Sequence, residues 1–144
     1  MSSGRTIGCF AAAMFVLNLA WEYLQMPLYL GGIKGLFPLG PALGFLASMG
    51  DVVMGLLLFV IVRTRIGRGL FAANGYLTII LLGIMLAAAV ESYALHIHLW
   101  KYSPLMPLLP WLGIGLSPLL QMGLTPPLAM SVADRLMKDT KRLV

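Results

Sequence analysis

The chain has 144 residues, of which 60% are hydrophobic and only 10% are charged, and its mean hydropathy is +0.92. Apolar runs of the length that spans a bilayer recur along it and leave no room for a separate soluble domain. The net charge of +5 lies mainly at the ends of these runs, so we interpret it as membrane orientation and expect no nucleic-acid partner. The single cysteine, Cys9, excludes an intrachain disulfide and a thiolate metal cluster.

Four membrane helices are predicted, at residues 7–29, 42–62, 71–95 and 108–133, followed by a basic tail at 134–144. Only helices or closed barrels satisfy every backbone group in lipid, and the segments between the runs are short and rich in glycine and proline. Neighbouring helices should therefore be antiparallel. The sequence predicts an all-α polytopic membrane protein with one domain, an antiparallel four-transmembrane-helix bundle.

The basic residues predict that both termini lie in the cytoplasm, an N-in/C-in arrangement. Lys34 and Lys101 fall on the outer side of the predicted helices. The cytoplasmic side receives Arg5, Arg63, Arg65, Arg68, Arg135, Lys138, Lys141 and Arg142. Alanines after Arg5 would also fit a signal peptide, but the apolar run continues through them to Tyr29, so we expect a retained helix.

The first predicted helix carries a polar stripe, because Asn18, Glu22, Gln25 and Tyr29 follow one another at spacings of four, three and four. A charged side chain in mid-membrane costs roughly 2.5 to 3.5 kcal/mol, so Glu22 is a functional-site hypothesis. It would act as a general acid or proton relay, with Asn18 and Gln25 holding its carboxyl group. The alternative is that the stripe only hydrogen-bonds to neighbouring helices.

Two further acids lie inside apolar runs. Asp51 shares a helical face with the small residues Gly44, Ser48 and Gly55, so it is either a second acid or base, or a carboxylate that pairs helices. Glu91 falls near the end of the third run. Folding the four helices up and down places all three acids in the outer half, and we expect a polar chamber there, closed on the inner side by apolar packing.

His96 and His98 follow Glu91 at the outer mouth, and a metal site built from Glu91, Asp51 and these histidines is one hypothesis. However, His-x-His splays the two rings apart on a helix, and the Glu-x-x-His pair of di-iron bundles is missing from the sequence. We therefore expect no metal, and without a glycine-rich phosphate loop we expect no cofactor. The alternative is an interfacial position for the histidines, beside an aromatic belt of Trp100, Tyr102 and Trp111.

The fourth predicted helix combines a polar stripe with helix-breaking prolines. The stripe recurs every four residues and consists of Gly113, Ser117, Gln121 and Thr125. The prolines are Pro118, Pro126 and Pro127, which free backbone carbonyls and favour a kink. Such a helix either lines a cavity or packs closely through its small residues, and both interpretations stay open.

The segment from Leu17 to Glu22 reads L-N-L-A-W-E, and its N-x-x-W-E pattern resembles the motif of the transmembrane terpene cyclases of fungal meroterpenoid and indole-diterpene pathways. It resembles the membrane-bound lycopene cyclases more loosely. The resemblance implies that Glu22 protonates an epoxide or alkene and starts a carbocation cascade. Trp21, Tyr23 and Tyr93 would then stabilise cations through their ring faces. The motif assigns no second acid, which would be Asp51 or Glu91.

Two other resemblances cover different segments. The E-x-x-Q-x-P of Glu22, Gln25 and Pro27 is similar to the E-x-x-x-Q-x-P of sterol isomerases and sigma-2 receptor proteins, with a spacing one residue shorter. The run from Trp100 to Gln121 is similar to that of small, uncharacterised bacterial four-helix inner-membrane proteins. It implies a multi-pass protein of the bacterial inner (cytoplasmic) membrane and carries no chemistry.

These observations favour an acid–base enzyme of the cyclase or isomerase type, or a binding protein, for a lipophilic isoprenoid or polycyclic small molecule. The catalytic candidates are Glu22, Asp51 and Glu91. The substrate-binding candidates are Asn18, Trp21, Tyr23, Gln25, Tyr93, His96, Trp100 and Gln121. One alternative is a small proton- or cation-coupled transporter or channel, in which a homodimer would form the pore. Another is an accessory subunit of a membrane complex.

Overall fold

The structure of the protein, a computed structural model, describes residues 3–30 and 40–142, and this part of the chain is mainly helical. The four long helices are α1 (Ser3–Gln25), α2 (Gly40–Ile66), α3 (Ala73–His96) and α4 (Leu116–Arg142). Two short 3₁₀ helices, η1 (Met26–Leu28) and η2 (Gly67–Gly69), and two short strands, β1 (Tyr29–Leu30) and β2 (Lys101–Tyr102), complete the described elements. The prediction of an all-helical fold class is confirmed for the long elements.

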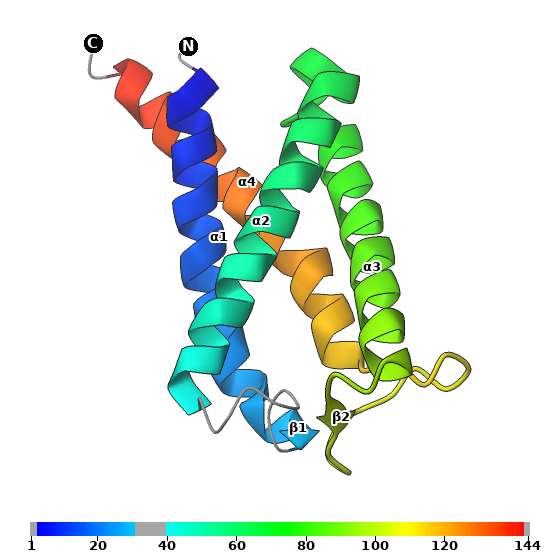
Figure 1. Ribbon diagram of the computed structural model, residues 1–144. Helices are drawn as coiled ribbons and strands as arrows, with labels where there is room; N and C mark the ends of the chain where they lie inside the picture. The colour runs from blue at the N-terminus through cyan, green and yellow to red at the C-terminus, as the bar shows by residue number, and fades with distance from the viewer. Residues whose placement is uncertain (1–2, 31–39, 143–144) are drawn as a thin grey trace.

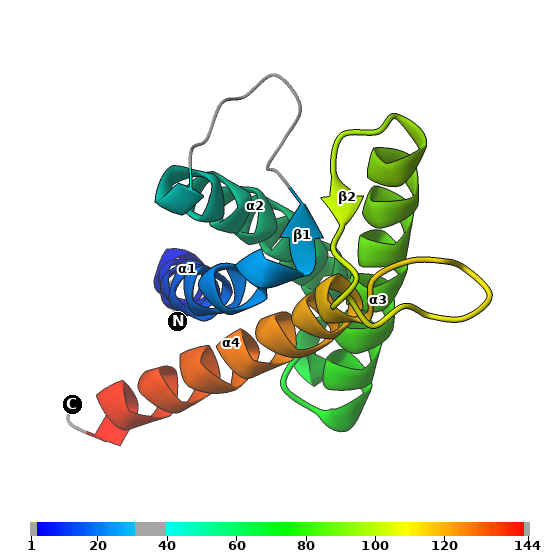
Figure 2. The same cartoon turned by 90° about the horizontal axis from the view of Figure 1, so that it is seen from below.

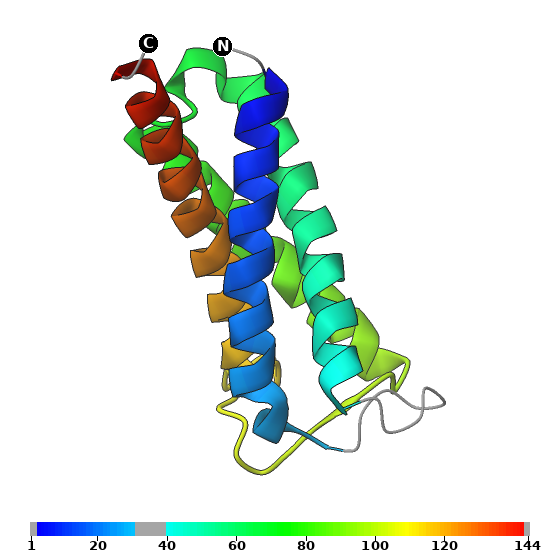
Figure 3. The ribbon, with the colours of Figure 1, turned by 90° about the vertical axis from the view of Figure 1, so that its left-hand side faces the viewer.

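The four helices run alternately up and down (Figure 1). Both chain termini and the link from α2 to α3 lie at one end, which we call the termini end. The strands β1 and β2 lie at the other, which we call the sheet end. Helix α1 packs against α2 and α4, and α3 also packs against α2 and α4 (Figures 2 and 3).

The basic residues are distributed unevenly between the termini end and the sheet end. Arg5 in the first turn of α1, Arg63 and Arg65 in the last turn of α2, and Arg135 and Lys138 in α4 all belong to the termini end. Lys101 belongs to β2 at the sheet end, whereas Lys34 lies outside the described residues. Most of the described positive charge is therefore at one end of the molecule.

Within the described residues, three helices are long and apolar enough to cross a membrane: Gly4–Leu28, Ala42–Ile66 and Ala73–His96. Helix α4 is not among them. Its first part contains three prolines together with Gln121 and Thr125, and charged residues begin at Asp134.

The start of the fourth helix was wrong in the prediction. Helix α4 begins at Leu116 and not at residue 108, because the preceding segment forms a hairpin. An isolated antiparallel bridge joins Leu108 to Gly115, and the Leu109 N–H donates to the Ile114 carbonyl oxygen at 2.8 Å. Gly113 has a φ of 64°, a conformation that favours glycine and ends the turn. The apolar composition of this segment reads as helix, but its turn residues prevent one.

The first helix is also shorter than predicted, because α1 ends at Gln25 and not at Tyr29. Pro27 lies within the 3₁₀ turn that follows, and Tyr29 continues as extended backbone. Strand β1 pairs antiparallel with β2, with Tyr29 opposite Tyr102. Ser103 reinforces this pairing, since its N–H donates to the Leu28 carbonyl and its hydroxyl to the Pro27 carbonyl, both at 2.9 Å. The pairing therefore joins the end of α1 to the segment that leads into α4.

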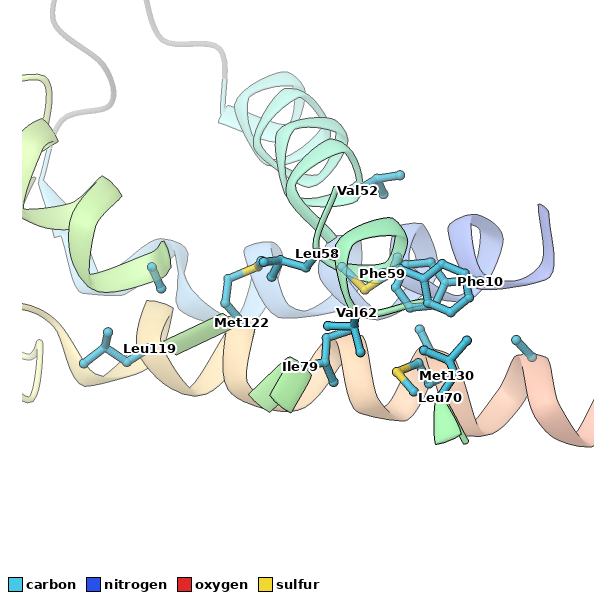
Figure 4. Close-up of a cluster of buried hydrophobic side chains, with 14 residues drawn as sticks. Phe10, Val52, Leu58, Phe59, Val62, Leu70, Ile79, Leu119, Met122 and Met130 are labelled. Atoms are coloured by element: carbon cyan, nitrogen blue, oxygen red, sulfur yellow. The ribbon is translucent and has the colours of Figure 1, made fainter. Parts of the chain in front are cut away.

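A cluster of buried apolar side chains extends between the helices, from Phe10 and Phe59 in the termini half to Leu119 in the sheet half (Figure 4). Phe10 of α1 stacks on Phe59 of α2 with ring centroids 4.4 Å apart, and both side chains are fully buried. Val62, Ile79 and Met130 pack around them from α2, α3 and α4. This packing holds all four helices together in the termini half.

Helices α3 and α4 approach each other closely at one point. A Cβ atom placed on Gly83 would lie 2.1 Å from the carbonyl oxygen of Met122. In a regular helix that carbonyl would accept a hydrogen bond from residue 126, but Pro126 has no N–H. The free carbonyl therefore faces the glycine backbone of α3, where a Cα–H group can approach it.

We expect Gly83→Ala to lower the free energy of unfolding by about 1 to 3 kcal/mol, because the added methyl group would overlap this carbonyl and force the two helices apart. Thermal unfolding in detergent, followed by circular dichroism, measures the effect. Gly50→Ala is the matched control, since a Cβ added at this α2 glycine meets nothing within 4 Å and should not destabilise. Equal losses in both variants would contradict the interpretation.

Candidate functional site

The polar stripes of α1 and α4 face each other between the helices. On α1, Asn18 and Gln25 are buried and Glu22 is half-buried, while Gln121 of α4 is 2% exposed. Asp51 enters from α2 and is also buried. Stripe spacings of three and four residues keep these side chains on single helix faces, and the three helices bring them to one place.

Gln121 is the centre of this network. Its Nε2 atom lies 2.8 Å from Glu22 Oε1, 2.8 Å from Asp51 Oδ2 and 3.0 Å from Asn18 Oδ1. An amide NH₂ group carries two hydrogens, so these three oxygens compete for two donors. One side chain of α4 thereby binds α1 and α2 together, and one acceptor is always left without a hydrogen from it.

The carboxyl groups of Glu22 and Asp51 form a pair. One oxygen of each lies 2.8 Å from the same nitrogen of Gln121. An ionised carboxylate only accepts hydrogen bonds, so a bond between two carboxyl groups requires one shared proton. Two like charges this close would also repel strongly, which again favours a single proton on the pair. The two acids, one from α1 and one from α2, therefore meet at a single amide of α4.

A second layer of side chains fixes the amides. Gln25 Nε2 donates to Glu22 Oε1 at 2.8 Å and to Gln121 Oε1 at 3.0 Å. The Ser117 hydroxyl donates to Gln25 Oε1 at 2.8 Å, and the Trp21 indole N–H donates to that hydroxyl at 3.2 Å. Each amide is thus bonded on both its nitrogen and its oxygen, which sets the orientation of both.

Thr125 and Asn18 extend the network toward the termini end. The Thr125 hydroxyl lies 3.2 Å from Asn18 Oδ1 and 2.9 Å from the Gln121 carbonyl oxygen. The Asn18 amide nitrogen donates to the Met14 carbonyl of its own helix at 2.8 Å. Met14 belongs to the apolar core, so the polar network ends there.

Small residues let α2 approach α1 on this side, as the sequence predicted. A Cβ atom on Gly44 would lie 3.6 Å from Glu22 Cβ, and one on Gly55 would lie 2.3 Å from the Met14 methyl group. The Ser48 hydroxyl donates to the Gly44 carbonyl at 2.6 Å within α2. The face that carries Asp51 is therefore in close contact with α1.

Glu91 forms a second cluster at the sheet end. Its Oε1 accepts from the Tyr29 hydroxyl at 3.4 Å, and its Oε2 accepts from the Trp100 indole N–H at 3.2 Å and from the Tyr102 hydroxyl. The Tyr102 hydroxyl in turn accepts from the Gly115 N–H at 2.9 Å. This carboxylate therefore joins α3 to both strands and to the residue that precedes α4.

The aromatic rings of this cluster also pack on one another. The Tyr29 ring meets the rings of Trp100 and Tyr102 edge to face, with centroids 6.2 and 5.6 Å apart. Burial raises the pKa of the Tyr29 phenol well above its usual value, and the negative charge of Glu91 raises it further. Burial also raises the pKa of Tyr102, as does its hydrogen bond to Glu91. Both phenols therefore remain hydrogen-bond donors to the carboxylate.

The two clusters interact. Glu91 is close enough to Asp51 and Glu22 for electrostatic interaction with both. The three acids therefore occupy one region, as their predicted depths indicated. The structure places Glu91 among aromatic donors, whereas His96 and His98 are exposed.

The substrate-binding candidates separate into two groups. Asn18, Trp21, Gln25 and Gln121 join the carboxyl pair, and Trp100 contacts Glu91. The remaining candidates lie nearer the surface. They are Tyr23, which is 44% exposed and packs near Gly44, Tyr93, which is 66% exposed, and His96.

Four residues of these clusters were not predicted as site residues. Ser117 and Thr125 belonged to the stripe of α4, and their spacing of four from Gln121 is the signal that places them beside it. Tyr29 belonged to the stripe of α1, and Tyr102 to the aromatic belt. Only the pairing of β1 with β2 brings both phenols to Glu91, and such a short pairing has no clear sequence signal.

Among residues 3–30 and 40–142, the structure contains no group of three or more histidine, cysteine, aspartate or glutamate side chains arranged to hold a metal ion. The polar groups around Gln121 are amides, hydroxyls and two carboxyl groups. Carboxyl groups in an apolar setting are of the kind that can act as general acids or bases.

Comparisons with protein-family models, with curated proteins and with solved structures found no match for this chain. The function is therefore argued from the geometry of the site.

We expect Gln121→Leu to lower the free energy of unfolding by about 1 to 3 kcal/mol for each buried partner that it leaves without a hydrogen bond. Equilibrium unfolding in mixed micelles measures the loss. Thr78→Val is the matched control, because this exposed hydroxyl only donates to the Asn74 carbonyl of its own helix. A loss no larger than that of the control would show that the network contributes nothing to stability.

The raised pKa of Tyr29 predicts a stability that falls at high pH. An unfolded tyrosine loses its proton near pH 10, whereas the folded Tyr29 keeps it. Above about pH 10 the unfolded state therefore binds fewer protons, and the free energy of unfolding falls by up to roughly 1.4 kcal/mol per pH unit for this residue. Below about pH 10, Tyr29 makes its full contribution to the free energy of unfolding. Tyr29→Phe should flatten the decline in alkaline unfolding experiments, and an unchanged slope would contradict this.

Proposed function

We propose that the chain is an acid–base enzyme of the cyclase or isomerase type, embedded in a membrane, that acts on a lipophilic isoprenoid or polycyclic substrate. The observation that carries the proposal is that Glu22 and Asp51 meet among apolar helices, each with a carboxyl oxygen 2.8 Å from Gln121 Nε2, and we infer that the pair shares one proton. An acid proton held in this apolar setting can be given to a weakly basic acceptor such as an alkene or an epoxide.

The two acids differ in accessibility, which assigns their roles. Glu22 is half-buried and stands in the last turn and a half of α1, whereas Asp51 is 9% exposed. We assign Glu22 as the group that gives the proton to the substrate and Asp51 as the group that shares the remaining negative charge. Gln121 and Gln25 donate to the carboxyl oxygens throughout and orient them.

The proposed reaction balances without a cofactor. The O–H bond of the pair breaks as a C–H bond forms on an alkene carbon, which leaves a carbocation on the substrate and a negative charge on the pair. Rearrangement or ring closure moves the cation, and loss of a proton from a neighbouring carbon forms a new double bond. That proton returns to the carboxylates, so the product is an isomer of the substrate.

Trp21 is placed beside the proposed acid, where its ring could stabilise the carbocation. It precedes Glu22 in the chain, and the bond from its indole N–H to Ser117 fixes the plane of its ring. An aromatic face near a developing cation stabilises it by roughly 0.5 to 2 kcal/mol. The N-x-x-W-E resemblance to transmembrane terpene cyclases is consistent with these roles of Trp21 and Glu22.

For the membrane arrangement, we propose four spans in the bacterial inner membrane with the termini end in the cytoplasm. The three apolar helices and the basic residues at the termini end support this orientation. Helix α4 would be the fourth span. Its polar residues face the other helices, and its leucines 120, 124 and 128 are exposed on the outer surface. The carboxyl pair and Glu91 would then face the outer leaflet.

A second candidate function is proton-coupled transport, and one observation favours it. Glu91 interacts electrostatically with the carboxyl pair and lies at the sheet end, so the three acids form a series from mid-membrane toward the outer side. Transport would require proton flux across vesicles, whereas the enzyme requires only exchange of protons with its substrate.

Transfer of solvent deuterium to carbon tests the proposal without a known substrate. Membranes that contain the protein, supplied with a mixture of polyprenyl lipids and incubated in D₂O, should yield lipids labelled on carbon. Glu22→Gln should lower the labelling rate by roughly 10² to 10⁴-fold while the protein remains folded, because a general acid contributes about that factor. Mass spectrometry of the extracted lipids gives the rate.

Asp134→Asn is the matched control, because this acid lies at the termini end and pairs with Lys138 at 2.5 Å. It should leave labelling unchanged. Absence of labelled lipid with the wild-type protein would refute the enzyme, and proton flux in vesicles that Asp51→Asn abolishes would establish the transporter in its place.

A further inference from the structure

A hairpin at residues 103–115 separates β2 from α4. It reads S-P-L-M-P-L-L-P-W-L-G-I-G and contains no charged side chain. The Leu109 N–H donates to the Ile114 carbonyl at 2.8 Å, and the Leu116 N–H donates to the Pro107 carbonyl at 2.7 Å. These bonds close the hairpin and give it a defined conformation.

The outer surface of this hairpin is strongly apolar. Trp111 is 96% exposed, Leu105 is 71% exposed and Leu112 is 64% exposed, and Leu108 beside them is 50% exposed. The hairpin is held from the other side, since Met106 and Ile114 are buried. Exposed apolar side chains gathered on one short segment mark a surface that contacts a partner or a membrane.

The hairpin lies beside α3, level with the end of that helix (Figures 1 and 2). It extends sideways from the four helices next to α3, as the yellow loop in Figure 2 shows. In Figure 1 it lies at the sheet end, at the level where α3 ends. If α3 crosses the bilayer, its end marks the boundary between hydrocarbon and headgroups, so the hairpin lies along this boundary.

Few backbone N–H groups of the hairpin would lose a hydrogen bond to water if it entered the membrane interface. Three of its residues are proline and have no N–H group. Most of the other N–H groups donate within the protein, including those of Leu112 and Gly113 to the Leu109 carbonyl and that of Gly115 to the Tyr102 hydroxyl. Unpaired backbone N–H groups are one cost of placing a loop in lipid, and this hairpin has few of them.

We propose that the hairpin inserts its apolar tip into the interface of the outer leaflet and anchors the sheet end to the bilayer. Tryptophan favours this interface because its ring is apolar and its N–H is polar. Ile97 after α3 and Leu120 of α4 are apolar and exposed as well. The hairpin lies level with the end of an apolar helix long enough to cross a membrane, and its tip is apolar apart from the Trp111 indole N–H, so the occupant that fits it is lipid.

Anchoring would fix the depth of the proposed acid–base site. The hairpin leads directly into α4, whose first turns carry Ser117 and Gln121, and Gly115 at its end is bonded to Tyr102 of the Glu91 cluster. The anchor does not depend on the proposed reaction, because it concerns only where the sheet end lies in the bilayer.

A fluorescent probe on the hairpin tests this anchor. Trp111→Cys in a Cys9→Ser background would be labelled with a polarity-sensitive dye and reconstituted into phosphatidylcholine–phosphatidylglycerol vesicles. Two reference positions are Lys101→Cys, on exposed strand β2, and Met85→Cys, in the middle of α3 and 67% exposed. Quenching by aqueous iodide and by phospholipids brominated near the headgroup or near the chain end then reports depth.

We expect iodide quenching at position 111 to be several-fold weaker than at position 101, with the strongest lipid quenching from chains brominated near the headgroup. Position 85 should respond most to bromine near the chain end. Iodide quenching equal to that at position 101 would overturn the proposal. So would protection without lipid quenching together with disulfide cross-links between copies, which would show that a second copy covers the tip. Leu112→Cys repeats the measurement if the first variant fails to fold.

Discussion

The site depends on one amide, that of Gln121. Its nitrogen is shared by side chains from α1 and α2, and its oxygen accepts from Gln25, so one residue of α4 sets the distance between three helices. Glycines let the backbones come close enough for these short side chains to meet. Because the amide has fewer hydrogens than neighbouring acceptors, the shared proton that we propose for the carboxyl pair would complete the hydrogen bonding. Removal of that proton would leave two negative charges side by side.

The molecule divides along its axis into two halves with different physical roles. The termini half is held by apolar packing around Phe10 and Phe59, whose fit depends on shape alone. The sheet half is held by directional bonds among amides, carboxyl groups and phenols. A bilayer gives helices little hydrophobic reason to associate, so close packing and hydrogen bonds must supply the attraction. The apolar half gives rigidity, and the polar half specifies which helix faces meet.

Much of this arrangement was predictable because helical spacing fixes direction. The stripes through Glu22 and Gln121 and the small residues around Asp51 indicate which faces turn inward, and alternating helices indicate the depth of each acid. The start of α4 and the environment of Glu91 were not predictable in the same way. The 108–115 segment is as apolar as a helix, and its conformation depends on Pro110 and Gly113 together. Tyr102 reaches Glu91 only through a two-residue strand pairing.

Pro126 and Gly83 illustrate how two local weaknesses compensate each other. The proline removes a hydrogen bond from α4, and the glycine lowers the helical propensity of α3, so each alone is unfavourable. Together they place a free carbonyl against a bare backbone, which holds the two helices at one fixed crossing point. The two positions depend on each other. A side chain at position 83 can be accommodated only if the Met122 carbonyl points along α4 again and accepts a hydrogen bond from residue 126. Substitutions at the two positions should therefore be accepted only as a coupled change during the divergence of related chains.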